Sequence, residues 1–249
     1  MTPPTPSGDA PRVSLARALS KLGACSRAQA AQAVRAGRVT VNGRMVRDPN
    51  VRVEPARDRL VLDGSRVRPA TRTYVMLNKP AGLVTTRADE RGRDTVYMCL
   101  EGAGYPRLVP VGRLDRETQG LLLFTNDTRW ADRIASPRSH IEKVYSVQLE
   151  QPVPEELIER LRAGVLSRGE MLNAVRVRRT GVSEIEIVLD EGRNRQVRRM
   201  LEESGARIAR LVRTAIGPLR LGRLIPGGHR PLTPAELAAV DATTARSEP

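Results

Sequence analysis

The segment from Gly112 to Thr125 constrains the fold more than any other part of this chain, because it places a carboxylate just before an apolar run. The run from Gly120 to Phe124 is too short for a helix and is followed by turn-forming residues, so it predicts a buried β-strand. Asp115 is therefore expected in a loop that enters the core. A carboxylate beside a low-dielectric interior needs a cation or several donors, and such acids concentrate at functional sites. A capping or turn aspartate is the alternative interpretation.

The charge of the chain indicates a polyanionic partner. Lys and Arg number 42 against 28 Asp and Glu, giving a net charge of +14 and a sequence pI of about 11.1, and nucleic acid is the first candidate for such a partner. All of the basic residues except Lys21, Lys79 and Lys143 are arginines, whose planar guanidinium groups suit bidentate phosphate contacts. GC-rich codons are the alternative reason for this bias. Residues 1–70 carry 13 basic against 5 acidic side chains, so more than half of the excess charge precedes residue 71.

Cysteine and histidine are too scarce for a disulfide framework or a metal site. Cys25, Cys99, His140 and His229 are the complete set, and we expect reduced thiols and no metal. The first eight residues lack the apolar core of a signal peptide, and no segment approaches the ~18 apolar residues of a membrane span. A cytoplasmic protein is expected, with residues 1–11 and 243–249 disordered.

Residues 12–70 predict a small domain that begins with two helices. Leucines recur at helical spacing up to Gly23, and Ser26 with Gln29 forms a capping box for a second helix that Gly37 closes. Residues 39–46 read as a strand, an Asn-Gly turn and a second strand. A further strand pair is expected over Val51–Val53 and Leu60–Leu62.

Three arginines of this first domain are candidate phosphate contacts. Arg27, Arg35 and Arg38 can lie on the polar side of the second helix and at the start of the hairpin, where they would follow an RNA backbone without reading bases. A solvated helix face is the alternative interpretation.

The domain resembles the small RNA-binding domain named after ribosomal protein S4. The matching positions are Leu15, Ala18, Leu19, Gly23, Ser26, Arg27, Ala30, Gly37, Val39, Val41, Asn42 and Gly43.

A polar, proline-containing linker over residues 67–73 leads to a second domain, expected over residues 74–242. It predicts an α+β fold built on a mixed, mainly antiparallel sheet. Strands are expected over Tyr74–Leu77, Leu121–Thr125, Val144–Leu149, Ala174–Arg179, Glu184–Leu189 and Arg207–Arg213. Helices are expected near Arg129–Ala135, Glu155–Ala163, Arg195–Ser204 and Ala235–Val240.

Four blocks of the second domain together resemble the pseudouridine synthases of the RsuA and RluB type. They are Asn78–Gly82, Gly112–Leu123, Lys143–Tyr145 and Glu191–Met200, in the expected order. The resemblance covers residues 12–240. It implies isomerisation of a uridine in ribosomal RNA to pseudouridine, without cofactor or metal.

The resemblance also implies roles for individual residues. Asp115 would be the nucleophilic catalyst, and Arg193 would pair with it and hold its charge in a desolvated pocket. Tyr145 would stack on the target base, although its parity with Val147 and Leu149 also suits a core tyrosine. Arg113 would fill the gap left by the flipped uridine.

Lys79 and Arg116 would be electrostatic helpers near the RNA or structural anchors. Position 119 is Gln where many relatives have a small residue, and position 195 is Arg where several have His, so substrate preference can differ.

The expected substrate is 23S rRNA, with 16S rRNA as the first alternative, either as free RNA or in an assembling ribosomal subunit. A noncatalytic RNA-binding or ribosome-assembly protein is the alternative of a different class, and a DNA-binding regulator lacks helix-turn-helix spacing. A monomer is the default expectation.

Overall fold

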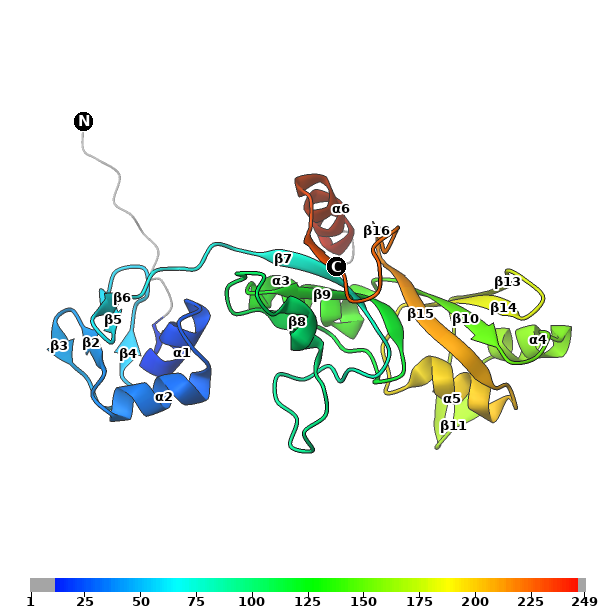
Figure 1. Ribbon diagram of the computed structural model, residues 1–249, viewed down its shortest axis with the longest axis horizontal. Coiled ribbons are helices and arrows are strands. Elements are labelled where there is room, and N and C mark those ends of the chain that lie inside the picture. The colour runs from blue at the N-terminus through cyan, green and yellow to red at the C-terminus, as the bar shows by residue number, and fades with distance from the viewer. Residues whose placement is uncertain (1–11, 246–249) are drawn as a thin grey trace. The chain divides into compact units, whose positions relative to one another are not determined.

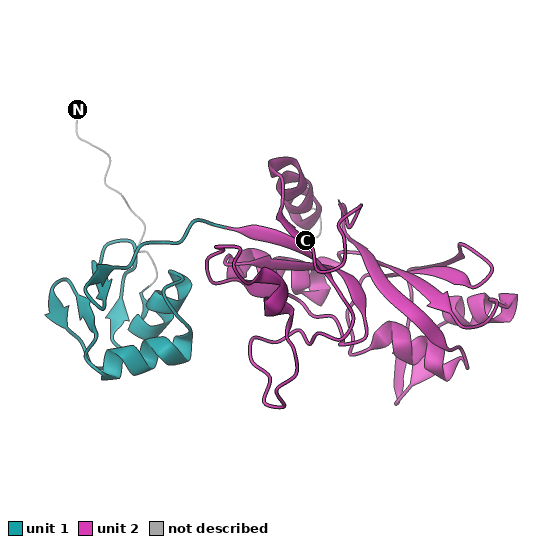
Figure 2. Ribbon diagram, viewed as in Figure 1, with its two compact units in different colours: residues 1–72 teal, residues 73–249 magenta. Residues whose placement is uncertain are grey.

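The computed structural model describes residues 12–245, so the disorder expected for residues 1–11 and 246–249 lies outside the described residues. The chain divides into two compact units, residues 1–72 and 73–249 (Figure 2). Residues 67–73, which connect them, have no regular secondary structure.

Unit 1 contains a helix pair and two small sheets. Helix α1 (Leu15–Lys21) and helix α2 (Arg27–Arg35) pack together, and the capping box predicted at Ser26 and Gln29 is confirmed. The four-stranded sheet has the order β3-β2-β5-β6. Its strands are β2 (Val39–Val41), β3 (Arg44–Met45), β5 (Leu60–Leu62) and β6 (Ser65–Arg66). The predicted hairpin of β2 and β3 is confirmed, with Asn42 and Gly43 both at positive φ in the turn.

The predicted pairing of Val51–Val53 with Leu60–Leu62 is wrong. Strand β4 (Arg52–Val53) pairs instead with β1 (Val13–Ser14), whereas β5 pairs with β2 and β6. Both segments are strands, but their ends separate at a turn in which the backbone N–H groups of Arg57 and Asp58 donate to the carbonyl of Glu54. Val53 and Leu60 still bury their side chains in the same core.

Unit 2 is built on a nine-stranded mixed sheet, which confirms the predicted fold class (Figure 1). The main path has the order β13-β14-β10-β15-β9-β7-β17, with β16 on β15 and β8 on β9. Every pair is antiparallel except β9 with β15. The strands are β7 (Tyr74–Lys79), β8 (Val109–Val111), β9 (Gln119–Thr125), β10 (Lys143–Leu149), β13 (Arg176–Arg179), β14 (Glu184–Leu189), β15 (Ile208–Ile216), β16 (Leu219–Arg220) and β17 (His229–Pro231).

The other elements of unit 2 cover this sheet. The helices are α3 (Thr128–Ala135), α4 (Glu155–Ala163), α5 (Gln196–Glu203) and α6 (Pro234–Ala245), with two 3-10 helices, η1 (Val96–Leu100) and η2 (Pro137–Ser139). A small separate hairpin is formed by β11 (Val165–Ser167) and β12 (Glu170–Leu172). Strands β8, β11, β12, β16 and β17 are short and were not predicted from the sequence.

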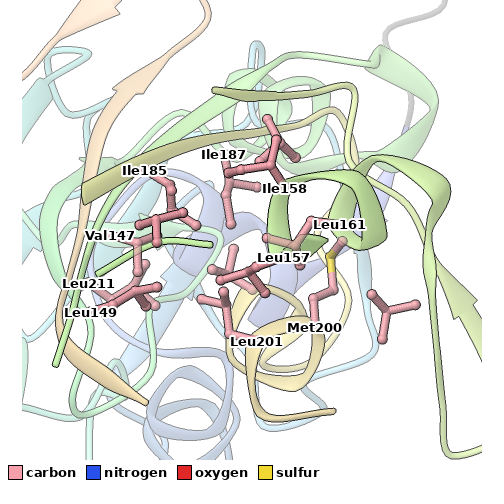
Figure 3. Close-up of a cluster of buried hydrophobic side chains, with 14 of the residues drawn as sticks. Val147, Leu149, Leu157, Ile158, Leu161, Ile185, Ile187, Met200, Leu201 and Leu211 are labelled. Carbon is pink, nitrogen blue, oxygen red and sulfur yellow. The ribbon is translucent and has the colours of Figure 1, made fainter. Parts of the chain in front are cut away.

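One core lies between one half of the sheet and two helices (Figure 3). It contains buried apolar side chains from one face of β10, β14 and β15 together with Leu157, Ile158 and Leu161 of α4 and Met200 and Leu201 of α5. The face of β10 predicted from its alternation is confirmed, because Val147 and Leu149 belong to this core and Tyr145 packs against it. The core therefore fixes the orientation of Tyr145.

Strand β9 is buried on both faces. Leu121 and Leu123 pack with α3 and α6 on one side, whereas Leu122 and Phe124 pack with η1 on the other. This burial explains why its sequence is continuously apolar rather than alternating, and it confirms the predicted buried strand. The loop that precedes β9, and with it Asp115, is thereby attached to the most buried strand of the unit.

The last helix continues further than the sequence predicts. Helix α6 ends at Ala245, three residues into the segment expected to be disordered from Thr243, because Thr244 is buried against the rest of the unit. Across residues 12–245, no helix combines the length and apolar character needed to cross a membrane.

Candidate active site

Lys79 holds one side of the loop that carries Asp115. Its side chain is fully buried, and Nζ donates hydrogen bonds to the carbonyl oxygens of Pro80 at 2.9 Å, Arg116 at 3.1 Å and Thr118 at 2.8 Å. Burial lowers the pKa of Lys79 to about 8, so these three carbonyls are what accommodate the ammonium inside the protein. Of the two roles expected for Lys79, an electrostatic helper near the RNA or a structural anchor, these contacts fit the structural anchor.

Thr85 holds the other side of the same loop. Its Oγ1 donates to the carbonyl of Leu114 at 2.8 Å and accepts from the backbone N–H of Leu114 at 3.3 Å. Leu114 is itself buried in the core beside η1. Asp115 is therefore fixed between two anchored neighbours in sequence, as a preorganised reactive group must be.

Asp115 faces a half-buried arginine across an ion pair. Its Oδ2 lies 4.0 Å from Nε of Arg198, whose side chain is 12% exposed against 29% for Asp115. Burial lowers the pKa of Arg198, and the charge of Arg195 acts in the same direction. Because a guanidinium keeps its proton throughout the pH range in which proteins are folded, Arg198 stays charged and balances the carboxylate.

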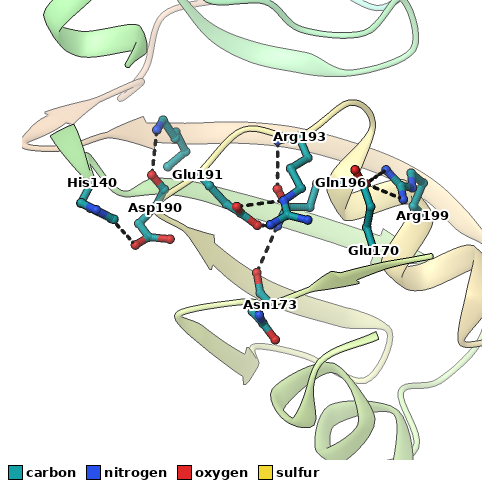
Figure 4. Close-up of polar contacts among 9 residues, drawn as sticks. His140, Glu170, Asn173, Asp190, Glu191, Arg193, Gln196 and Arg199 are labelled. Carbon is teal, nitrogen blue, oxygen red and sulfur yellow. Dashed lines mark hydrogen bonds and ion pairs between the residues drawn. The ribbon is translucent and has the colours of Figure 1, made fainter. Parts of the chain in front are cut away.

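The predicted pairing of Arg193 with Asp115 is wrong. Nε of Arg193 donates instead to Glu191 at 3.0 Å, and Gln196 links the same segment to Glu191 and to the carbonyl of Asn173 (Figure 4). Arg193 precedes α5, whereas Arg198 lies within the helix. The helical turn therefore brings Arg198 to the carboxylate of Asp115. The sequence of the block Glu191–Met200 does not by itself show which of its arginines does so.

A cavity of about 150 Å³ opens beside Asp115. In the described part of the chain its lining contains one carboxylate, Asp115, and six basic residues. The basic residues are Arg113, Lys143, Arg193, Arg195, Arg198 and Arg213. Tyr145 also lines the cavity, so the structure brings Tyr145, Arg113 and Arg193 together around Asp115.

The cavity continues into a second, more open one of about 570 Å³. Arg113, Asp115 and Arg195 line both, and the loop from Val84 to Arg93 forms much of the second lining. Arg113 is exposed where the two meet. Arg116 lines the second cavity and is also an anchor, because its Nε donates to the carbonyl of Gly82 at 3.1 Å.

The three candidate arginines of unit 1 differ in their contacts. Arg27 and Arg35 are exposed on α2. Arg38 is exposed too, but its guanidinium forms a two-bond contact with Asp63, one bond being 2.6 Å from Nε. Arg38 therefore offers less free positive charge to a phosphate than Arg27 and Arg35.

Sequence reasoning missed Arg198, Arg213 and Thr85. Arg213 carried a detectable signal, because a charged residue at the buried parity of a strand, between Leu211 and Ala215, is uncommon. Thr85 carried none, since its role depends on a loop that returns to the sheet. Among residues 12–245, no three His, Cys, Asp or Glu side chains lie together in a way that would hold a metal ion.

Comparison with known proteins accounts for both units. Residues 73–203 match the profile of the RNA pseudouridylate synthase family, and residues 13–60 match the S4 domain. Ribosomal large subunit pseudouridine synthase B of Bacillus subtilis is 32% identical, over 90% of this chain and 93% of that protein. Ribosomal small subunit pseudouridine synthase A of Escherichia coli K12 is 36% identical, over 86% of this chain and 94% of that protein.

A crystal structure of a pseudouridylate synthase superimposes with a TM-score of 0.66 at 32% identity, covering 92% of this chain and 99% of that one. The resemblance found in the four sequence blocks is thus confirmed over nearly the whole length. The chain belongs to the RsuA/RluB-type rRNA pseudouridine synthases, a family of isomerases, and carries the N-terminal S4 domain of that type.

Proposed function

We propose that this enzyme converts a specific uridine of ribosomal RNA to pseudouridine, with 23S rRNA as substrate and Asp115 as nucleophilic catalyst. The observation that carries the proposal is the position of Asp115, which is the one carboxylate among the described residues that line a cavity otherwise rich in cations. A carboxylate that faces Arg198 and sits in an anchored loop is held in a fixed orientation beside the cavity, which nucleophilic catalysis requires.

The reaction exchanges one bond of the target nucleotide for another. The bond between C1′ and N1 of uracil breaks, a bond between C1′ and C5 forms, and the hydrogen on C5 leaves as a proton. The enzyme must first extrude the base from its stack, at a cost of a few kcal/mol. We assign Tyr145 to pack against the extruded base, and the exposed Arg113 at the cavity mouth to take its place in the RNA.

Positive charge outside the cavity would hold the RNA. Arg27 and Arg35 of α2 are exposed and suited to phosphate contacts, which supply affinity without reading sequence. Arg195 lies where the two cavities meet and is suited to a phosphate next to the extruded nucleotide. Unit 1 is thus assigned to RNA binding, and unit 2 to catalysis and to contacts next to the extruded nucleotide.

The experiment is tritium release from 23S and 16S rRNA transcripts labelled at C5 of uridine. Release from 23S rRNA alone is the expected result. Release from 16S rRNA alone would replace the substrate assignment and keep the reaction, and it would match the activity named for the similar small-subunit enzyme of Escherichia coli. Release from neither RNA, nor from ribosomal assembly intermediates, would favour a noncatalytic RNA-binding protein.

Arg198 and Arg193 are expected to give different kinetic defects. Arg198→Met removes the cation beside Asp115 and should lower kcat about 10²-fold, as loss of one preorganised electrostatic partner does. Arg193→Met removes a cavity-lining cation that is bound to Glu191 and should act mainly on RNA affinity. Single-turnover tritium release and filter binding separate the two effects. Equal losses of kcat in both variants would contradict the assignment of Arg198.

A further inference from the structure

Buried polar atoms without hydrogen-bond partners are concentrated at the cavity beside Asp115. Within residues 12–245, five buried side-chain nitrogen or oxygen atoms lack a hydrogen-bond partner. Three of them, Oγ1 of Thr118, Nε of Arg198 and Nη2 of Arg213, belong to residues that line this one cavity. Because buried polar groups are satisfied in the great majority of cases, such a concentration indicates a site prepared for a polar ligand.

Of the two arginines in this set, Arg213 is the more deeply buried. It is 5% exposed, and its Nε donates to the carbonyl of Leu121 at 2.8 Å, which leaves Nη2 unused. In the sheet Arg213 pairs directly with Tyr145, and directly opposed residues of antiparallel strands project to the same face. Arg213 therefore lies next to the tyrosine that we assign to the base.

A second buried cation accompanies Arg213. Lys143 is 9% exposed and lines the same cavity, and its Nζ donates a long hydrogen bond of 3.3 Å to the carbonyl of Asp190. Burial lowers the pKa of Lys143, and the nearby charge of Arg213 lowers it further, whereas the charges of Asp190 and Glu191 act in the opposite direction. Neither Lys143 nor Arg213 forms an ion pair among the described residues. Two neighbouring buried cations that lack an ion pair are costly, so the site is suited to negative charge brought by a ligand.

We propose that Arg213 and Lys143 bind the carbonyl oxygens of the extruded uracil and stabilise the negative charge that develops on the base. This inference rests on the proposed function, which supplies the substrate. It makes both residues catalytic groups in addition to Asp115.

The chemistry places charge on these oxygens by either route open to Asp115. If Asp115 attacks C1′, the bond between C1′ and N1 breaks, and its electron pair leaves with uracil and is delocalised over N1, O2 and O4. C5 then attacks C1′ and expels the carboxylate, C5 loses its proton, and N1 gains one. If Asp115 instead adds to C6, the electron pair of the C5–C6 double bond shifts to C4–C5 and the carbonyl pair moves onto O4. The C1′–N1 bond then breaks, C1′ bonds to C5, C5 loses its proton, N1 gains one, and expulsion of the carboxylate restores the C5–C6 double bond. Fixed donors at these oxygens stabilise both species.

Burial and size favour a base rather than a phosphate at this position. A cavity of about 150 Å³ accommodates a six-membered ring. Arg213 and Lys143 are buried, whereas Arg113 and Arg195 are exposed on the same cavity and are better placed for phosphates. The buried pair is therefore assigned to the part of the nucleotide that enters deepest.

The decisive variants are Arg213→Met and Lys143→Met, with Arg199→Met as a matched control. Arg199 is a buried arginine of the same unit, 7% exposed, whose guanidinium is bound to Ser167 and Glu170. Arg213→Met and Lys143→Met should lower single-turnover tritium release about 10²- to 10³-fold while leaving rRNA affinity unchanged. They should also unfold at the same or a higher urea concentration, because an uncompensated buried charge is removed. Arg199→Met should show the opposite pattern, losing stability while its folded fraction retains turnover.

Substrate analogues test the contact with the base directly. Tritium-labelled transcripts with 2-thiouridine or 4-thiouridine replace one carbonyl oxygen by sulfur, which is a weak acceptor. One of the two should slow the wild type, and the same replacement should slow Arg213→Met by a much smaller factor, because the contact is already lost. Equal slowing of both enzymes by both analogues would overturn the inference.

The outcomes separate this inference from the proposed function. If Asp115→Asn is inactive but Arg213→Met turns over like the wild type, the inference alone fails. It also fails if Arg213→Met loses only RNA affinity, which would indicate a phosphate contact, or loses stability as Arg199→Met does. If the wild type releases no tritium from any ribosomal RNA substrate, the proposed function fails and the inference fails with it.

Discussion

Asp115→Asn is expected to abolish tritium release from labelled rRNA, lowering single-turnover rates by at least about 10⁴-fold, as removal of a nucleophile does. The amide has the same shape as the carboxylate, so the loop held by Lys79 and Thr85 should keep its conformation. RNA affinity should be retained or increase slightly, because one negative charge is removed from a cationic cavity. Release kinetics and filter binding on the same protein preparation test both statements.

Glu117→Gln provides the matched control for this prediction. Glu117 is two residues from Asp115, carries the same charge and is exposed, with Arg116 at 3.8 Å as its ion-pair partner. Turnover close to that of the wild type is expected from this variant. If Asp115→Asn retained activity within tenfold of the wild type, Asp115 would be a structural aspartate and the catalytic assignment would be lost.

The position of Asp115 in a loop ahead of a buried strand could be predicted from sequence, because the cause is local. The apolar run of β9 is too short for a helix, and turn-forming residues follow it. A strand buried on both faces is the structure that this pattern favours. The helix pair and hairpin of unit 1 were predictable for the same reason, since the capping box and the Asn-Gly turn determine them within a few residues.

The partner of Asp115 could not be predicted, because it depends on tertiary geometry. Arg193 and Arg198 lie five residues apart in one basic block, and only the start of α5 at Gln196 determines which of them reaches the carboxylate. Lys79 is a similar case. Its sequence context suited an RNA contact, but its buried ammonium donates to the carbonyl of the adjacent Pro80 and to the carbonyls of Arg116 and Thr118 in a distant loop.

The prediction that β4 pairs with β5 was wrong for a related reason. Both were recognised as strands, yet strand pairing is decided by long-range contacts that local patterns do not encode. The same limit concealed Arg213, whose importance follows from the strands on either side of it. Strand β10 brings Tyr145 to it from one side, and strand β9 brings Gly120 from the other.

Gly120→Ala is expected to be among the most destabilising single substitutions in unit 2, costing about 2–5 kcal/mol of unfolding free energy. Strand β9 meets β15 in the only parallel pairing of the described sheet, where Gly120 lies opposite Arg213. A Cβ at Gly120 would come within 2.3 Å of the carbonyl oxygen and 2.8 Å of the nitrogen of Arg213, and its φ of +102° disfavours any side chain. Backbone atoms cannot move aside as a flexible side chain can, so β9 and β15 would have to separate.

Gly169→Ala is the control that separates the free-energy cost of a positive φ from the cost of the steric clash. Gly169 has a φ of +79° in the turn between β11 and β12, but a Cβ there would meet nothing within 4 Å. Its loss should therefore be limited to about 1–2 kcal/mol, measured with Gly120→Ala by urea unfolding. Similar losses in the two variants would mean that β9 and β15 can separate at little cost. The carbonyl of Leu121 in β9 accepts the hydrogen bond from Nε of Arg213. A separation of β9 from β15 would therefore also release Arg213 from the position that we propose it needs for catalysis.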